Sequence, residues 1–230
     1  MLKFVGIGSC FNFEKGNTSA YYIDKEEKSL LLIDCGENVF EKLGKKGLLE
    51  NIEKVTVVIT HLHSDHVGSL PSLIFYLYLM LGIKANVIYP DKNDIVERIL
   101  FTVGDNMYNI YTPEEYNEKI GKYIFNPIKQ KHSCNINAYG YEITIEGKNI
   151  FYSGDTHVLS NDILNNFLNH KYDYFYHEVC KCENIDHHPI KELMEEIPLD
   201  RRKEVYCMHI SDNELLQMVK DAGFNIPIVE

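Results

Sequence analysis

A cluster of histidine and aspartate side chains constrains this chain more than any other feature. Residues 61–66 read His-x-His-x-Asp-His and supply His61, His63, Asp65 and His66. Imidazole and carboxylate groups are ligands that divalent first-row metal ions prefer. Side chains alternate in direction along an extended backbone, so His61 and His63 face one ion while Asp65 and His66 can reach a second. A histidine-rich surface turn is the alternative, but so dense a cluster is hard to explain without a metal.

The sequence around this cluster indicates how it is held. Residues 55–60 form a short β-branched run, which is typical of a buried strand. The cluster therefore follows the C-terminal end of a strand, where loops commonly carry chemistry. Residues 67–82 then predict a helix with Pro71 in its first turns.

Short apolar runs and helical stretches alternate along the rest of the chain. We expect further strands at residues 2–8, 20–24, 30–34, 85–89, 139–145, 149–153, 172–176 and 205–209. We expect helices at residues 39–49, 92–103, 162–169, 190–196 and 213–222. Two strand-rich halves with intervening helices predict an α/β fold. No linker or low-complexity stretch interrupts the pattern, so residues 1–230 are expected to form a single domain.

The net charge and hydropathy of the chain exclude some partners. The formal charge is −11, with 34 acidic against 23 basic side chains. A protein that embraces a long polyanion normally carries a basic surface, so long nucleic acid is disfavoured. The longest apolar run, residues 73–81, is far shorter than the roughly 20 residues that span a bilayer. We interpret it as a buried or subunit-contacting helix of a protein without a membrane partner.

The cysteines indicate a reducing compartment. All six are scattered without a paired framework. Residues 1–6 run directly into a strand-like pattern, which argues against a signal peptide. We therefore expect free thiols and a cytoplasmic protein. Cys180 and Cys182 form a C-x-C pair, but two ordinary loop thiols explain it better than a redox centre.

Polar residues at the ends of other apolar runs are candidates for the same site. A pair of metal ions needs more ligands than residues 61–66 provide. The further candidates are Asp34, His132, Asp155 and His209. Each stands where a strand is expected to end, so each can join a site built on strand-end loops.

The order of these motifs resembles the metallo-β-lactamase superfamily, and within it the ribonuclease Z branch. The matching segments are Gly6-Ile7-Gly8-Ser9, Gly16-Asn17-Thr18-Ser19, Asp34-Cys35-Gly36, the histidine cluster with Gly68, Leu70, Pro71 and Leu73, His132 with Tyr139-Gly140-Tyr141, Ser153-Gly154-Asp155-Thr156, and His209-Ile210-Ser211. The histidine cluster is the specific motif, and the others gain weight from their order. The resemblance implies an αββα sandwich, in which two mixed β-sheets are flanked by helices.

The resemblance also implies a metal site. It would hold two Zn2+ ions, with Mn2+ or iron as alternatives. The ligands would be His61, His63 and His132 for one ion, Asp65, His66 and His209 for the other, and Asp155 as a bridge. Asp34 would orient one of the ligand imidazoles.

A second pair of residues bears on the reaction. In ribonuclease Z-like enzymes a His-Glu pair protonates the leaving oxygen. By motif order Glu178 and His188 match that pair, with His187 as the competing assignment. An alkoxide is a poor leaving group, and an imidazolium held by a carboxylate can supply its proton. Asp65 is in addition a candidate to accept a proton from the attacking water. The implied activity is that of a dinuclear-metal phosphodiesterase.

Differences from ribonuclease Z limit the range of expected substrates. No Gly/Pro-rich insertion that would grip a tRNA is visible, and Asp212-Asn213 stand where the branch commonly has Arg-Tyr. In size and motif order the chain is similar to phage anti-Pycsar enzymes, which are homodimers that hydrolyse cyclic CMP, cyclic UMP and other cyclic mononucleotides. The resemblance therefore implies a phage-encoded, homodimeric enzyme that blunts antiphage signalling in the host bacterial cytoplasm.

A tyrosine-rich segment is the candidate for base recognition. In the anti-Pycsar enzymes a loop of one subunit covers the active site of the other, and residues 106–116 are the matching segment here. Tyr108 or Tyr111 would stack on the base, a contact that contributes about 1–3 kcal/mol. Alternatively, these tyrosines pack at a dimer contact, because aromatic side chains are enriched at interfaces.

Three other functions are weighed against this one. A tRNA 3′-endonuclease of the ribonuclease Z type is the nearest alternative. A non-catalytic protein that sequesters a nucleotide would not need a full ligand set and an acid pair. A lactonase, thioesterase or glyoxalase-type hydrolase would share the histidine cluster but would have no use for Glu178 and its histidine.

Overall fold

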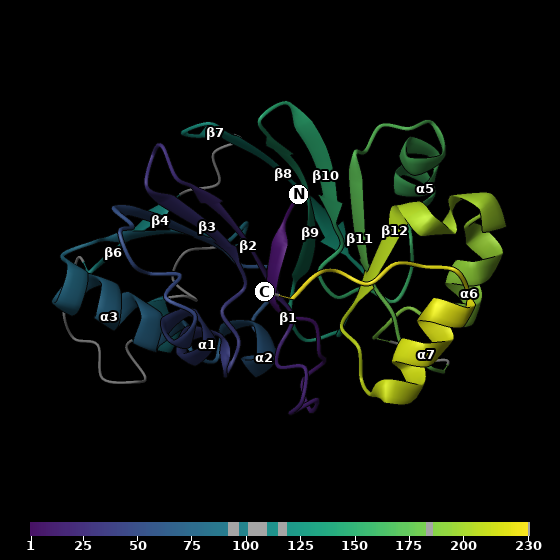
Figure 1. The fold of residues 1–230 in the computed structure, drawn as a ribbon, viewed down its shortest axis with the longest axis horizontal. Helices are drawn as coiled ribbons and strands as arrows, with labels where there is room; N and C mark the ends of the chain where they lie inside the picture. Colours follow the sequence, from purple (N-terminus) through teal and green to yellow (C-terminus); the bar gives the residue numbers. More distant parts are fainter. Residues whose placement is uncertain (92–96, 101–109, 115–118, 183–185, 230) are drawn as a thin grey trace. The chain divides into compact units, whose positions relative to one another are not determined.

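The computed structural model describes residues 1–91, 97–100, 110–114, 119–182 and 186–229. The chain divides into two compact units. The first comprises residues 1–6, 16–116 and 229–230, and the second comprises residues 7–15 and 117–228. Each unit contains one six-stranded β-sheet with helices beside it (Figure 1).

The first unit is built on a mixed sheet with the strand order β1-β2-β3-β4-β5-β6. Its strands are β1 (Lys3–Gly6), β2 (Ser19–Asp24), β3 (Ser29–Ile33), β4 (Lys54–Val58), β5 (Ala85–Ile88) and β6 (Tyr111–Glu114). The two pairings of β2 are antiparallel, and the pairings from β3 to β6 are parallel. Because β3 and β4 are parallel, the loops that follow them leave the same edge of the sheet.

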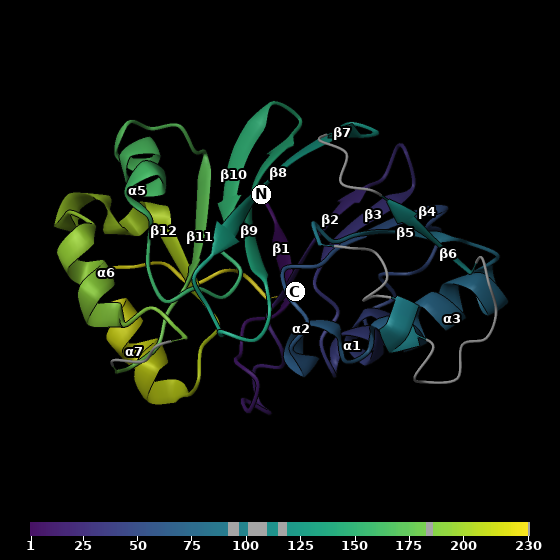
Figure 2. The same cartoon turned by 180° about the vertical axis from the view of Figure 1, so that it is seen from behind.

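The structure describes in this unit the helices α1 (Val39–Lys45), α2 (Ser64–Val67) and α3 (Leu70–Leu81), and residues 97–100 are also helical. Figure 2 shows α1 and α3 along one face of the sheet. Every side chain of β3, which reads Ser-Leu-Leu-Leu-Ile, is buried. Such a continuous apolar run is typical of a parallel strand that is covered on both faces. The core therefore holds firmly the strand that directly precedes Asp34.

The second unit has a mixed sheet with the strand order β12-β11-β10-β9-β8-β7. Its strands are β7 (Lys119–Ile120), β8 (Tyr123–Gln130), β9 (Ala138–Ile145), β10 (Lys148–Tyr152), β11 (Tyr174–Glu178) and β12 (Val205–Met208). β10, β11 and β12 run parallel, so the loops that follow them also share one edge. The helices of this unit are α5 (Asn161–Leu168), α6 (Ile190–Glu196), η1 (Leu199–Glu204) and α7 (Asn213–Asp221).

Side-chain caps fix the starts of two of these helices. Ser160 Oγ accepts a hydrogen bond of 3.4 Å from the N–H of Ile163 at the start of α5. Asp212 Oδ1 accepts one of 2.9 Å from the N–H of Leu215 at the start of α7. Such a cap stabilises a helix by about 1 kcal/mol. Asp212 thus has a structural role as the cap of α7.

Most of the expected elements are confirmed, with ends that differ by a few residues. The helix expected at residues 67–82 is interrupted, because the N–H of Ser69 donates to the carbonyl of Cys35 (3.1 Å). The helix expected at residues 92–103 lies largely outside the described residues. Among the helices that the structure describes, none has the length and hydropathy to cross a bilayer.

One long strand is missed by the sequence analysis. β8 contains Pro127, which argues against a strand because proline cannot donate to a neighbouring strand. Pro127 nevertheless pairs opposite Tyr141 of β9. Among the described residues, β8 pairs on its other side with β7 at Tyr123 and Ile124.

Candidate metal and acid–base site

In the first unit, the four residues of the histidine cluster lie together after β4. His61 Nε2 lies 3.0 Å from His63 Nδ1, and the rings of His61 and His66 are 4.0 Å apart. In α2, Asp65 Oδ2 lies 3.4 Å from His66 Nε2. His61, Asp65 and His66 are buried, whereas His63 is more open to solvent. Three imidazoles and a carboxylate are thus gathered in a partly desolvated group, which is the donor chemistry of a zinc-type site.

Asp34 fixes the orientation of one of these imidazoles. Its fully buried carboxylate accepts hydrogen bonds from the backbone N–H of Thr60 (2.7 Å), the Thr60 hydroxyl (2.7 Å) and His66 Nδ1 (2.8 Å). Burial raises the pKa of Asp34 above its ordinary value, and the contacts with His66 and Thr60 oppose that shift. With Nδ1 of His66 donating to Asp34, Nε2 is left to act as a ligand. Thr60, the first residue of the Thr-His-Leu-His segment, was not among the residues expected at the site.

A glycine lets the loop after β3 approach this cluster. A Cβ atom on Gly36 would lie 2.0 Å from the carbonyl oxygen of Asp65, so no larger residue fits without displacement. The neighbouring N–H of Cys35 donates to the carbonyl of His66 (2.7 Å). The Asp-Cys-Gly segment therefore positions both Asp65 and His66 through the backbone.

In the second unit, four residues converge from different segments. His132 follows β8, Asp155 follows β10, Glu178 ends β11, and His187 lies in the next loop. One ligand atom from each lies within 4.8 Å of those of the others. These four residues could bind a metal ion, or two of them could form a pair that transfers a proton. Their hydrogen bonds distinguish the two roles.

His132 and His209 are presented in ways that suit metal ligands. His132 Nδ1 lies 2.7 Å from the carbonyl oxygen of Asp186. It therefore carries the proton, and Nε2 is left as the ligand atom. His209, with a φ of 62°, follows β12 and places Nε2 3.4 Å from Asp155 Oδ2. Its ring stacks on that of His187 at 4.9 Å.

Glu178 and His187 are engaged with each other. His187 Nδ1 lies 2.8 Å from Glu178 Oε2 and 3.1 Å from Oε1. The backbone N–H of Thr156 also donates to this carboxylate, which is fully buried. Although burial disfavours the imidazolium, the hydrogen bond and charge of Glu178 raise the pKa of His187 above its ordinary value. An imidazolium held in this way is suited to donate a proton.

Glu178 was expected to pair with His188, but in the structure it pairs with His187. His188 is fully buried, and its Nδ1 lies 2.8 Å from His177 Nε2. The competing residue, His187, occupies the position beside Glu178. Motif order alone does not separate the two histidines, because adjacent side chains on extended backbone face opposite sides.

Of the two candidate tyrosines, one lies among the residues that the structure describes. Tyr111 begins β6 and is half-buried. Tyr108 lies outside the described residues. Base stacking by either residue therefore stays a prediction.

Comparison with solved structures identifies the fold class. YhfI from Bacillus subtilis, a metallo-β-lactamase fold protein, matches with a TM-score of 0.71 at 15% identity, covering 100% of this chain and 95% of that one. The short form of human tRNase Z matches with a TM-score of 0.68 at 18% identity, covering 93% of each chain. The chain therefore has the metallo-β-lactamase fold, with two mixed β-sheets flanked by helices, as expected.

Sequence comparison then gives the family. The family model described as Anti-Pycsar protein Apyc1 matches residues 1–226, and the chain belongs to that family. Curated relatives of this name include those of Bacillus phage 010DV004, 26% identical, and Bacillus phage BSP38, 27% identical. Each alignment covers 92% of this chain and 89% of the relative.

A zinc phosphodiesterase is also among the relatives. The ELAC protein 2 homolog of Caenorhabditis elegans, named a zinc phosphodiesterase, is 26% identical over 67% of this chain and 25% of its own length. Family and fold together support a phosphodiesterase-like hydrolase with a metal cofactor.

Proposed function

We propose that this protein is a dinuclear-metal phosphodiesterase that hydrolyses cyclic mononucleotides, such as cyclic CMP and cyclic UMP, to nucleoside monophosphates. The observation that carries the proposal is the pairing of His187 with the buried carboxylate of Glu178, beside Asp155, in a chain of the Anti-Pycsar family. A cyclic phosphodiester has a ribose alkoxide as its leaving group, and that group needs a proton donor. In a phage-encoded protein this activity would remove a host signalling nucleotide in the bacterial cytoplasm.

The proposed metal ligands are the seven residues inferred from the sequence. They are His61, His63, Asp65, His66, His132, Asp155 and His209. Two features support this set. Hydrogen bonds of Nδ1 in His66 and His132 leave Nε2 for coordination, and buried carboxylates accompany the imidazoles in each unit. When bound, a pair of Zn2+ ions would supply Lewis acidity and lower the pKa of water.

The protein's own residues would manage the protons. Water oxygen forms the new bond to phosphorus, and the bond from phosphorus to the ribose oxygen breaks. His187 gives its proton to that departing oxygen, and Glu178 stabilises the imidazolium beforehand. Asp65 is the proposed acceptor of a proton from the water. Held between Thr156 and His187, Glu178 has little freedom to move away from its partner.

The choice of a small substrate rests on charge. The net charge of −11 gives no basic footprint for a long polyanion. Stacking of the base on Tyr108 or Tyr111 is part of the proposal, and separate alanine variants should raise KM for cyclic CMP. The tRNA 3′-endonuclease stays the second candidate, because the chain is 43% identical over 72 residues to a ribonuclease Z of Metallosphaera sedula.

We further propose that the protein is a homodimer. The C-terminal end of α3 leaves apolar side chains in solvent: Leu79 is 61% exposed and Met80 is 69% exposed. Exposed apolar side chains at one end of a helix favour contact with a second copy of the chain. Sedimentation of the wild type beside a Leu79→Lys, Met80→Lys variant tests this directly, because the variant should be a monomer.

One assay tests the activity. Protein supplied with zinc or manganese is incubated with cyclic CMP, cyclic UMP, cyclic AMP, cyclic GMP and a precursor tRNA, and products are separated by chromatography. The proposal requires a nucleoside monophosphate from at least one cyclic nucleotide and metal-dependent turnover. Cleavage of the tRNA alone would favour the ribonuclease Z alternative, and tight binding without product would favour a sequestering protein.

A further inference from the structure

A second pair of histidines lies directly behind the acid pair. His177 precedes Glu178 on β11, and His188 follows His187 in the loop. His177 Nε2 lies 2.8 Å from His188 Nδ1, and both side chains are fully buried. Adjacent side chains on extended backbone face opposite sides. Two neighbouring residues of the strand therefore each pair with one of two neighbouring residues of the loop. One pair, His187–Glu178, serves the site, and the other, His188–His177, lies in the core.

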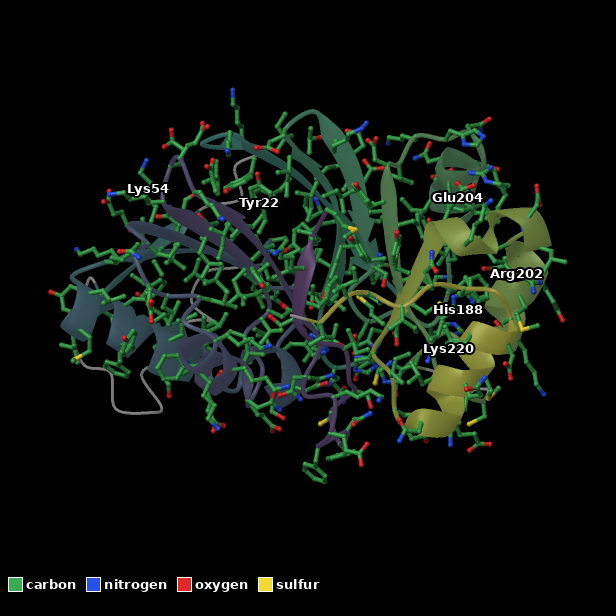
Figure 3. All side chains as sticks on the ribbon, in the orientation of Figure 1. Tyr22, Lys54, His188, Arg202, Glu204 and Lys220 are labelled. Atoms are coloured by element: carbon green, nitrogen blue, oxygen red, sulfur yellow. The ribbon has the colours of Figure 1, made fainter. Side chains whose placement is uncertain are left out.

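The core pair is a neutral hydrogen bond between two imidazoles. Burial lowers the pKa of His188 to about 4 and lowers that of His177 well below its ordinary value. One ring must therefore donate and the other accept, which fixes the orientation of both. Glu196, the last residue of α6, places Oε2 3.6 Å from His188 Nε2 on the far side of the ring. Figure 3 shows His188 among the elements of the second unit.

Backbone hydrogen bonds hold the loop where it leaves and re-enters the fold. The N–H of Cys180 donates to the carbonyl of His188 (2.8 Å), and the N–H of Ile190 donates to the carbonyl of Cys180 (2.9 Å). These bonds fix the backbone near residue 188 but not the side chain of His187, which is still 24% exposed. A site needs its groups within about 0.5 Å of the productive position. The core pair supplies a restraint immediately next to His187.

We propose that His188 and His177 are positioning residues, whose buried hydrogen bond sets the direction of the His187 side chain and keeps its Nδ1 against Glu178. The catalytic consequence rests on the proposed function. His188 does not touch the substrate, because its ring is enclosed and bonded to His177. Its replacement should therefore affect proton donation to the leaving oxygen and spare substrate binding.

Two kinds of variant separate positioning from simple packing. His188→Leu and His177→Leu retain apolar volume but remove the hydrogen bond. His188→Asn and His177→Gln are the conservative variants, because the amide of asparagine stands near the place of Nδ1 and that of glutamine near the place of Nε2. His170→Asn serves as the control, since His170 is a surface histidine of the same unit with a φ of 58°, which asparagine tolerates.

Activity is measured on two substrates that differ in leaving group. For cyclic CMP, the leucine variants should lower kcat by about 10- to 100-fold with KM little changed, the usual effect of losing an outer hydrogen-bond partner. For bis-p-nitrophenyl phosphate, turnover should change by less than about threefold, because p-nitrophenolate leaves without a proton. The asparagine and glutamine variants should recover most of the lost kcat. Metal content is measured in parallel and should be unchanged.

A second measurement does not depend on activity. In protein labelled with 15N at histidine, the His187 ring should show a protected Nδ1–H signal, assigned by its absence in His187→Gln. The signal should weaken or disappear in His188→Leu and His177→Leu and persist in the His170→Asn control. This measurement also applies if one leucine variant folds poorly, because the other variant and the conservative pair are examined in the same way.

The outcomes distinguish the two proposals. If the wild type hydrolyses cyclic CMP but the leucine variants match it on both substrates, the positioning role is wrong. Equal losses on both substrates, with an unchanged His187 signal, would also overturn it. If the wild type hydrolyses no phosphodiester, the proposed function fails, and the Nδ1–H signal alone decides whether His188 orients His187.

Discussion

His187 Nδ1 lies 2.8 Å from Oε2 of Glu178, whereas the adjacent His188 faces His177. This contact is the reason that His187, rather than His188, is the proposed proton donor. It also explains why Glu178 tolerates complete burial, because its carboxylate accepts hydrogen bonds from His187 and from the N–H of Thr156. A buried carboxylate without such partners would cost several kcal/mol.

Replacing His187 by alanine should lower kcat for a cyclic nucleotide by about 100- to 10,000-fold, the range for loss of a general acid. Turnover of bis-p-nitrophenyl phosphate should fall far less, because its leaving group needs no proton. Steady-state kinetics on the metal-loaded protein measure both values, with His170→Asn as the control. Equal losses on the two substrates would mean that His187 acts on something other than the leaving group.

Replacing Asp34 by asparagine should weaken metal affinity by about 10- to 100-fold, because the carboxylate orients a proposed ligand imidazole. The substitution retains the shape of the side chain but removes the charge that pairs with His66 Nδ1 at 2.8 Å. Titration against a chromogenic chelator measures the affinity. Asp24→Asn is the matched control, since Asp24 is a buried aspartate of the same sheet whose Oδ1 caps a hairpin. Equal affinities for wild type and Asp34→Asn would contradict the orienting role.

The fold class followed from the sequence because the informative residues are local. The β-branched run at residues 55–60 and the polar residues at strand ends carry their own signals. As expected, Asp34, His132 and His209 come within two residues of the end of a strand. The roles of His132 and His209 as metal ligands, and of Asp34 as the residue that orients a ligand, stay predictions.

Other features depend on contacts that the sequence does not contain. The choice between His187 and His188 depends on which of these two adjacent side chains faces Glu178 in the fold. β8 was missed because Pro127 argues against a strand, although in the fold it pairs opposite Tyr141 of β9. In both cases the structure is decided by a contact between segments, and the residues of one segment alone do not predict that contact.

Two glycines of the first unit should respond to alanine in opposite directions. Gly36→Ala should destabilise the protein by about 1–3 kcal/mol and weaken metal binding, because the new Cβ would meet the Asp65 carbonyl at 2.0 Å. Gly44→Ala should stabilise it by about 0.5–1 kcal/mol, because Gly44 lies in α1 with nothing within 4 Å of the added carbon. Urea unfolding measures both changes. A Gly36→Ala variant as stable as the wild type would show that the Asp65 loop can move aside.

Glu196 and His188 should make the stability of the protein depend on pH in opposite directions. Burial, followed by the charge of Glu192, raises the pKa of Glu196 from 4.5 to about 7. Its contribution to stability is fully present below pH 4.5 and is lost as pH rises through 7. Burial lowers the pKa of His188 from 6.5 to about 4, so its contribution is present above pH 6.5 and is lost as pH falls through 4.

Between pH 4.5 and 6.5 these two effects oppose each other, so removing one of them should expose the other. Glu196→Gln should lose more stability than the wild type on acidification from pH 7 to pH 5, and His188→Asn should lose less. Each pKa unit corresponds to about 1.4 kcal/mol, so differences on the order of 1–2 kcal/mol are expected once partial exposure of Glu196 is considered. Urea unfolding at pH 7, 6 and 5 measures them. Parallel curves for Glu196→Gln and the wild type would mean that Glu196 titrates with its ordinary pKa, and that α6 does not hold a protonated carboxyl against His188.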